Sequence, residues 1–331
     1  MATVAPRPGR CWYCGDAHLL STDAPEHVIP AAIGAGLATD RVGGACNQRA
    51  GREVDAVFLD DWFVREARER HGIGDRRHSG KPPRGPRQSA ALEDGTPVRI
   101  DTGDQWRPVA QSRVERDETE IRIWAADETE LDRLIKKEML RIRLEGKTAT
   151  PGVARPMPIE RPRVNVQFQV DRYIWLRMAA KVALATASLV LDESWLDSEQ
   201  ARELQGWLWD SRPTNRNGEQ LQGAPVRPEG AAMPLLCRPP EHLVLFHPMG
   251  RERAGLMAAV FGEVLLPIPA IELGGQPQPQ RAWRLDPTTG RTVATTREAL
   301  LAEAAVALVQ AMNAAPGNSA EVPPDSESSF D

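Results

Sequence analysis

The sequence predicts an α+β protein in which a small N-terminal unit precedes a larger mixed region of helices and strands. Apolar residues recur at helical spacing along residues 128–144 and 173–191, which indicates two helices with buried faces. Residues 164–170 instead alternate polar and apolar side chains, as a half-buried strand does. Three of the four cysteines stand in the first fifty residues, which favours a metal site over a disulfide framework.

The N-terminal unit, residues 1–70, is expected to contain a turn at the first two cysteines, a short strand and a helix. The strand covers residues 26–29 and ends at Pro30, because proline cannot continue the interior of a strand. Glycines at positions 34, 36, 43 and 44 indicate a loop. Apolar residues at helical spacing then predict a helix from Asn47 to about residue 70.

Composition divides the rest of the chain into three parts. Residues 71–91 are rich in proline, glycine and arginine, which predicts a basic linker. Residues 92–312 are predicted to form an α+β domain of unknown role, and residues 313–331 a disordered tail. Within residues 92–312 we expect strands near 97–101, 120–124, 164–170, 243–247 and 255–267, helices near 128–144, 173–191, 198–209 and 298–312, and a long loop at 211–234.

Composition also limits the classes of function. The chain is 41% apolar and 26% charged, which is typical of a globular protein. Its net charge of −5 leaves any nucleic-acid site to a local basic patch. The N-terminus lacks the apolar core of a signal peptide, and Lys181 and Glu263 interrupt the longest apolar runs, which argues against a transmembrane helix. We therefore expect a cytoplasmic protein without a membrane partner.

The first two cysteines have the spacing of a zinc knuckle. Two thiolates separated by two residues, Cys11 and Cys14, can bind one tetrahedral ion. A structural zinc ion there would staple a unit that has little core of its own. Cys46 is the third candidate ligand, whereas Cys237 stands far away in the sequence and is expected to be a buried free thiol.

A carboxylate and a histidine follow the knuckle, at Glu26 and His27. A neutral histidine can act as a general base near neutral pH. Oxygen ligands such as Glu, Asp and Asn side chains suit Mg²⁺ or Mn²⁺. Hydrolysis of a phosphodiester needs an activated water, a cation on the phosphate oxygens and correct geometry. The residue types of this unit therefore suit metal-dependent nuclease chemistry.

Residues 11–63 resemble the HNH endonucleases, in particular the cysteine-containing branch with a ββα-metal, or His-Me finger, fold. The resemblance rests on three motifs, which are Cys11-x-x-Cys14, Glu26-His27-Val28-Ile29-Pro30, and Cys46-Asn47 followed by Gly51 and Asp55. It implies that His27 is the general base and that Glu26 binds the catalytic Mg²⁺ or Mn²⁺. It also implies that Asn47 binds the same cation or positions the histidine, and that Asp55 takes the third motif position.

The sequence departs from the family pattern at Gly43. The second zinc pair of the family is another CxxC, which ends at the cysteine before the asparagine, and Gly43 stands at its first position. Three cysteines therefore remain for four ligand positions. Either His18 or Asp40 completes the zinc site, or the zinc is lost and the knuckle is held by packing.

Five basic residues of the linker form a candidate nucleic-acid contact: Arg76, Arg77, Lys81, Arg84 and Arg87. Clustered Arg and Lys side chains displace counterions from phosphates, so such a loop strengthens binding to any nucleic acid. A solvated linker without such contacts is the alternative interpretation.

These expectations describe a metal-dependent endonuclease that hydrolyses DNA, with RNA as the alternative substrate. Fusions of this kind suggest phage defence or restriction by analogy. The alternatives are a non-catalytic zinc-ribbon-like protein that binds nucleic acid, and an interaction protein with a purely structural knuckle. Intact Glu26, His27 and Asn47 favour the enzyme, because a binding module has no need of a base beside hard-metal ligands.

Overall fold

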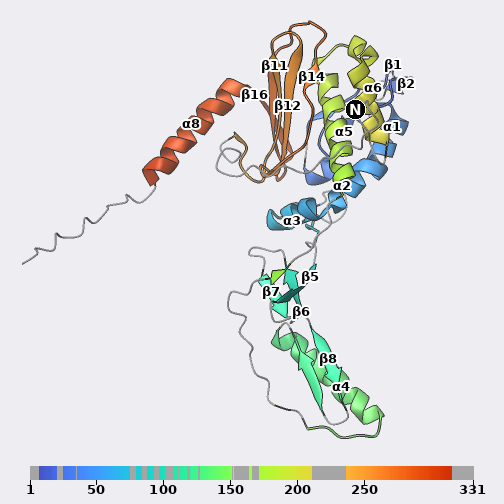
Figure 1. The fold of residues 1–331 in the computed structure, drawn as a ribbon, viewed down its shortest axis with the longest axis vertical. Coiled ribbons are helices and arrows are strands. Elements are labelled where there is room, and N and C mark those ends of the chain that lie inside the picture. The colour runs from blue at the N-terminus through green and yellow to red at the C-terminus, as the bar shows by residue number, and fades with distance from the viewer. Residues whose placement is uncertain are drawn as a thin grey trace, which may run out of the picture.

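Helices and antiparallel sheets are mixed in the structure, which confirms the predicted α+β class (Figure 1). The structure is a computed structural model. It describes residues 7–20, 25–34, 36–74, 80–83, 88–92, 97–101, 107–110, 112–117, 120–125, 127–150, 152, 164–165, 171–210 and 236–314.

The N-terminal unit consists of two antiparallel hairpins and a broken helix. Its elements in chain order are β1 (Arg7–Arg10), β2 (Ala17–Leu20), β3 (Glu26–His27), the short 3-10 helix η1 (Ala31–Ile33), β4 (Ala38–Thr39), α1 (Gly44–Ala50), the π-helical turn η2 (Gly51–Asp55), α2 (Ala56–Asp60) and α3 (Trp62–Arg70). β1 pairs with β2, and β3 pairs with β4. The strand predicted at 26–29 is therefore shorter, and the helix begins at Gly44 rather than Asn47.

The helix predicted to run to residue 70 is interrupted at Asp61. The backbone of Asp61 is extended, with φ −57° and ψ 144°. Its carboxylate accepts the N–H of Phe63 at 3.0 Å and the indole N–H of Trp175 at 3.2 Å. An aspartate at this position satisfies an amide that the start of a helix leaves without an intrahelical partner. A new helix, α3, therefore begins at the next residue.

The middle of the chain forms a small sheet, a hairpin and a helix that project from the main body in Figure 1. Its elements are β5 (Gln88–Leu92), β6 (Pro97–Asp101), β7 (Arg107–Ala110), β8 (Arg113–Arg116), β9 (Ile121–Trp124), α4 (Glu128–Leu144) and β10 (Val164–Asn165). The sheet is antiparallel, with strand order β10-β5-β6-β7, and β8 pairs with β9. The predicted helix at 128–144 is confirmed, whereas residues 166–170 of the predicted strand lie outside the described residues.

The C-terminal part contributes helices and a six-stranded antiparallel sheet of order β13-β12-β11-β15-β16, with β14 paired to β12. Its elements are α5 (Arg172–Val190), the 3-10 helix η3 (Glu193–Asp197), α6 (Glu199–Trp209), β11 (His242–Met249), β12 (Arg253–Val260), β13 (Val264–Leu265), β14 (Ile271–Glu272), β15 (Arg281–Asp286), β16 (Arg291–Thr295) and α8 (Arg297–Ala314). The three helices predicted here are confirmed. The predicted loop at 211–234 and the tail after residue 314 lie outside the described residues.

Helix α5 runs between the N-terminal unit and the six-stranded sheet (Figure 1). The carboxylate of Asp171 caps it by accepting the N–H of Tyr173 at 3.0 Å. All of its residues from Ile174 to Ser188 are buried except Arg177. The helix is long and apolar enough to cross a membrane, but most of it is buried inside the fold. A helix that is apolar on every side is the expected centre of a packed core.

One hydrophobic core joins the N-terminal unit to the C-terminal elements. Trp12 stacks on Trp195 with 5.6 Å between ring centroids, and Phe58 packs edge-on against Trp175 at 5.0 Å. This core crosses the predicted boundary between domains 1–70 and 92–312. Trp12 and Phe58 of the N-terminal unit are therefore buried against tryptophans of the C-terminal elements.

Candidate metal centre

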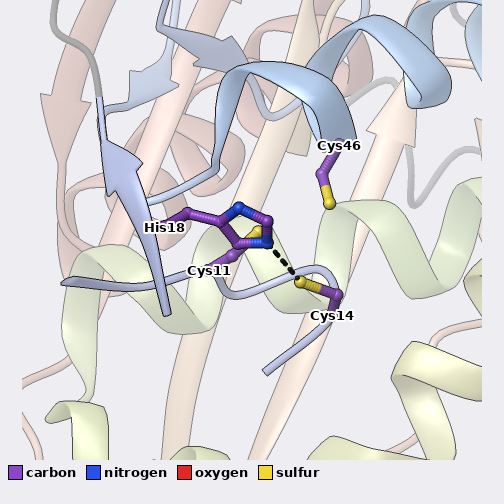
Figure 2. A group of neighbouring side chains, drawn as sticks. All are labelled: Cys11, Cys14, His18 and Cys46. Carbon is purple, nitrogen blue, oxygen red and sulfur yellow. Dashed lines mark hydrogen bonds between the residues drawn. The ribbon is translucent and has the colours of Figure 1, made fainter. Parts of the chain in front are cut away.

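Four side chains of the N-terminal unit face one another around a common centre, as Figure 2 shows for Cys11, Cys14, His18 and Cys46. Their donor atoms all lie within 4.8 Å of one another, and Cys14 Sγ lies 3.1 Å from His18 Nε2. In a tetrahedral zinc site with Zn–S bonds of about 2.3 Å, sulfur atoms are about 3.8 Å apart. This group of donors can therefore hold a metal ion such as zinc.

The β1–β2 hairpin places three of these ligands. Gly15, with φ +80°, allows the tight turn after Cys14, and its N–H donates to the carbonyl of Cys11 at 2.8 Å. The strand that follows carries His18 opposite Gly9. Cys46 lies in the first turn of α1. Gly43, the N-cap of this helix, forms a β-bridge with Leu20 of β2, so the start of α1 lies next to the hairpin.

The absence of a side chain at Gly43 leaves room for the imidazole of His18. A Cβ atom on Gly43 would lie 2.9 Å from Cγ and 3.0 Å from Cβ of His18, which is closer than such atoms approach. Its N–H also donates to Cys11 Sγ at 3.3 Å, a contact that favours the thiolate. Of the two candidates for the fourth ligand, the structure brings His18 into the group and not Asp40.

The thiols of this group need a cation to ionise together. Burial, together with the neighbouring Cys11, raises the pKa of the Cys46 thiol to about 11. Burial likewise raises the pKa of the Cys14 thiol. A bound divalent cation reverses this preference, because a coordinating thiol is deprotonated outright. The chemistry of the donor set, three sulfurs and one imidazole, is that of a closed structural zinc site.

The predicted catalytic carboxylates meet at the ammonium group of Lys181, a residue of α5. Glu26 Oε1 lies 2.8 Å and Asp55 Oδ1 2.5 Å from Lys181 Nζ. The hydroxyl of Tyr13 donates to the same oxygen of Glu26 at 2.9 Å. Glu26 and Lys181 are buried, and the Asp55 side chain is 19% exposed. Strand β3 and the helical segment that ends at Asp55 are thus fastened to one buried cation.

The pKa values in this network follow from burial and charge together. Burial raises the pKa of Glu26, although the Lys181 ammonium opposes that change. Burial lowers the pKa of Lys181, but Asp55 and Glu26 raise it by more, so it lies above its ordinary value. Burial also raises the pKa of Tyr13, in keeping with its role as the donor to Glu26. Lys181 is therefore an ammonium ion at neutral pH.

The carboxylates do not fit the predicted Mg²⁺ or Mn²⁺ site while Lys181 contacts both of them. Among the residues that the structure describes, the cysteine–histidine group is the only set of three or more Cys, His, Asp and Glu side chains placed to hold an ion. Asn47 lies half-buried on α1, and its N–H donates to the carbonyl of Gly43 at 2.9 Å. His27 lies half-buried on β3, opposite Ala38.

Most of the predicted nucleic-acid contact lies outside the described residues, namely Arg76, Arg77, Arg84 and Arg87. Lys81 is described and exposed. The linker prediction and the phosphate-contact prediction therefore both remain predictions.

The sequence pattern does not predict that Lys181 pairs with Glu26 and Asp55. The signal that could have identified it is its position in an apolar, Ala-rich helix. A lysine that is buried there needs a carboxylate partner. Comparison of the chain with protein-family models, curated proteins and solved structures found no match.

Proposed function

We propose that the protein is a metal-dependent endonuclease whose nuclease unit is an HNH-type ββα finger stapled by zinc. One observation carries the proposal. Glu26 of β3 and Asp55 of η2 both contact the ammonium group of Lys181, so the strand with His27 is held against the helical segment that begins at Gly44 and contains Asn47. Strand β3, strand β4 and helix α1 also follow one another in the order that such a finger requires.

In this proposal zinc is bound by Cys11, Cys14, His18 and Cys46, and its role is structural. Four protein ligands close the coordination sphere, so no position remains for water or substrate. Binding such an ion contributes directly to folding, because the unfolded chain has no preformed site. The zinc thereby fixes the knuckle, whose Tyr13 donates to Glu26 next to His27.

His27 is the proposed general base. A neutral imidazole can take the proton of an attacking water near pH 7. Its neighbour Glu26 is fixed by two partners, so β3 is held in place beside it. A divalent cation supplies charge stabilisation at the phosphate. Asn47 is the predicted ligand that offers it an oxygen, and Mg²⁺ commonly keeps several waters beside few protein ligands.

A cleavage assay on the zinc-loaded protein tests this proposal. Plasmid DNA and an RNA of matched sequence are incubated with the protein and Mg²⁺ or Mn²⁺. A parallel reaction, to which EDTA is added after zinc loading, serves as the reaction without a divalent cation. We expect His27→Ala to lower the cleavage rate by about 10²–10⁴-fold, the usual cost of removing a general base. Its zinc content and thermal melting should equal those of the wild type.

His247→Ala is the matched control, since His247 is also half-buried but lies on β11, outside the N-terminal unit. This variant should cleave at the wild-type rate. Two results would refute the proposed endonuclease activity. One is cleavage by His27→Ala at the wild-type rate, and the other is no cleavage by the wild type with either metal and either substrate.

A non-catalytic nucleic-acid-binding module is the second candidate. One observation favours it, which is that the two carboxylates of the predicted cation site are paired with Lys181. Wild-type protein that retards DNA or RNA in a gel without cutting either one would support this alternative.

A further inference from the structure

Lys181 fills a position that has the geometry of a cation site. Its ammonium group is fully buried and lies within 2.8 Å of carboxylate oxygens from two different elements, β3 and η2. A divalent cation such as Mg²⁺ binds oxygens at about 2.0–2.1 Å, whereas N···O distances of 2.5–2.8 Å are those of charge-assisted hydrogen bonds. The oxygens are thus spaced for an ammonium ion.

Charge also favours the ammonium ion. Two carboxylates and one ammonium carry a net charge of −1, and Tyr13 adds a neutral donor to Glu26. A divalent ion between the same oxygens would have to lie next to a buried, charged lysine. Repulsion between like charges is strong where little water screens it.

We infer that Lys181 serves as a built-in cation, which holds β3 and η2 to α5 and keeps Glu26 and Asp55 from binding a divalent metal. Helix α5 makes a second contact with the same hairpin, in which the Ser188 hydroxyl donates to the Thr39 hydroxyl of β4 at 2.8 Å. Helix α5 therefore contacts both strands of the β3–β4 hairpin through polar side chains. The inference concerns the site of the proposed function, but it does not depend on cleavage.

Counting bound Mn²⁺ ions tests the inference directly. Zinc-loaded protein is titrated with Mn²⁺, and free Mn²⁺ is measured by electron paramagnetic resonance. The wild type and Asp55→Asn should bind equal numbers of Mn²⁺ ions. Lys181→Ala should bind one more, because its two carboxylates lose their cation, and the additional ion should disappear in Lys181→Ala/Asp55→Asn.

Arg177→Ala is the matched control, because Arg177 is another basic residue of α5, one turn earlier, with an ion pair to Glu53 at 3.6 Å. It should bind as many Mn²⁺ ions as the wild type. This control separates the loss of a basic residue from α5 from the exposure of the two carboxylates.

Two results would overturn the inference. One is that the single variant Asp55→Asn binds fewer Mn²⁺ ions than the wild type. Asp55→Asn keeps the Lys181–Glu26 pair, so this result decides the question even if Lys181→Ala does not fold. The other is a folded Lys181→Ala that binds no additional Mn²⁺. Loss of an ion in Asn47→Ala concerns the proposed nuclease site instead, so the two proposals fail independently.

Discussion

At the scale of single residues, a glycine and a histidine together complete the candidate metal centre. His18 alone is an ordinary strand residue, and Gly43 alone is an ordinary helix N-cap. Because a side chain on residue 43 would occupy the space of the imidazole, the ligand at 18 and the absence of a side chain at 43 depend on each other. Position 43 thus carries no ligand, but its lack of a side chain allows His18 to join the three cysteines.

Gly43→Ala tests this dependence. The added methyl group should push the His18 ring from its place and lower zinc affinity by about 10–100-fold, the usual effect of disturbing the surroundings of a metal ligand. Competition with a chromophoric chelator measures the change. Gly44→Ala is the matched control, because nothing lies within 4 Å of its Cβ position. Equal zinc affinities in the two variants would contradict the assignment of His18.

At the scale of elements, His242 of β11 ties the sheet to the N-terminal unit. Its Nε2 lies 3.0 Å from the carbonyl oxygen of Ile33 in η1 and therefore carries the proton, while Nδ1 accepts the N–H of Phe261 at 3.0 Å. The ring is fully buried, and burial lowers its pKa to about 4. In the neutral ring one nitrogen donates and the other accepts a hydrogen bond. Protonation of Nδ1 would therefore break its hydrogen bond with the N–H of Phe261.

This arrangement predicts a pH dependence of stability. The pKa of His242 is lower in the folded than in the unfolded chain, where it is near 6.5. Its contribution to the free energy of unfolding is therefore complete above pH 6.5 and is lost as the pH falls towards 4, by up to roughly 3 kcal/mol. Urea titrations of wild type and His242→Gln across this range measure it. The difference in stability between them should shrink at low pH, and a constant difference would contradict the prediction.

At the scale of the whole molecule, two distant parts of the chain share one core. Besides the stacked tryptophans, Arg70 and His71 at the end of α3 contact Glu263 of the six-stranded sheet's β12–β13 turn at 2.7 and 2.9 Å. Lys181 adds a buried ionic contact between α5 and the N-terminal unit. We therefore expect the N-terminal unit and the C-terminal elements to depend on each other for folding.

Fragment complementation checks this dependence. Residues 166–331 expressed alone should lack a cooperative thermal transition, because Trp175, Lys181 and Trp195 lose their partners in the N-terminal unit. Adding residues 1–165 should restore a single transition, seen by near-ultraviolet circular dichroism. A cooperative transition in residues 166–331 alone would contradict the dependence on the N-terminal unit.

The sequence by itself determined what depends on neighbouring residues. Cysteine spacing predicted the knuckle, apolar periodicity predicted the helices at 128–144 and 173–191, and the order of short elements predicted the α+β class. Each of these features depends on spacing along the chain, which the sequence displays directly.

The tertiary structure alone decided what those residues contact. Sequence spacing left His18 and Asp40 equivalent as fourth ligands, and only the approach of β2 to Gly43 distinguishes them. The cation between Glu26 and Asp55 is Lys181, from more than a hundred residues away. A buried charge requires a partner but does not specify where in the chain that partner stands. The packing of α5 against the N-terminal unit supplies it, and the same packing buries apolar side chains of both parts.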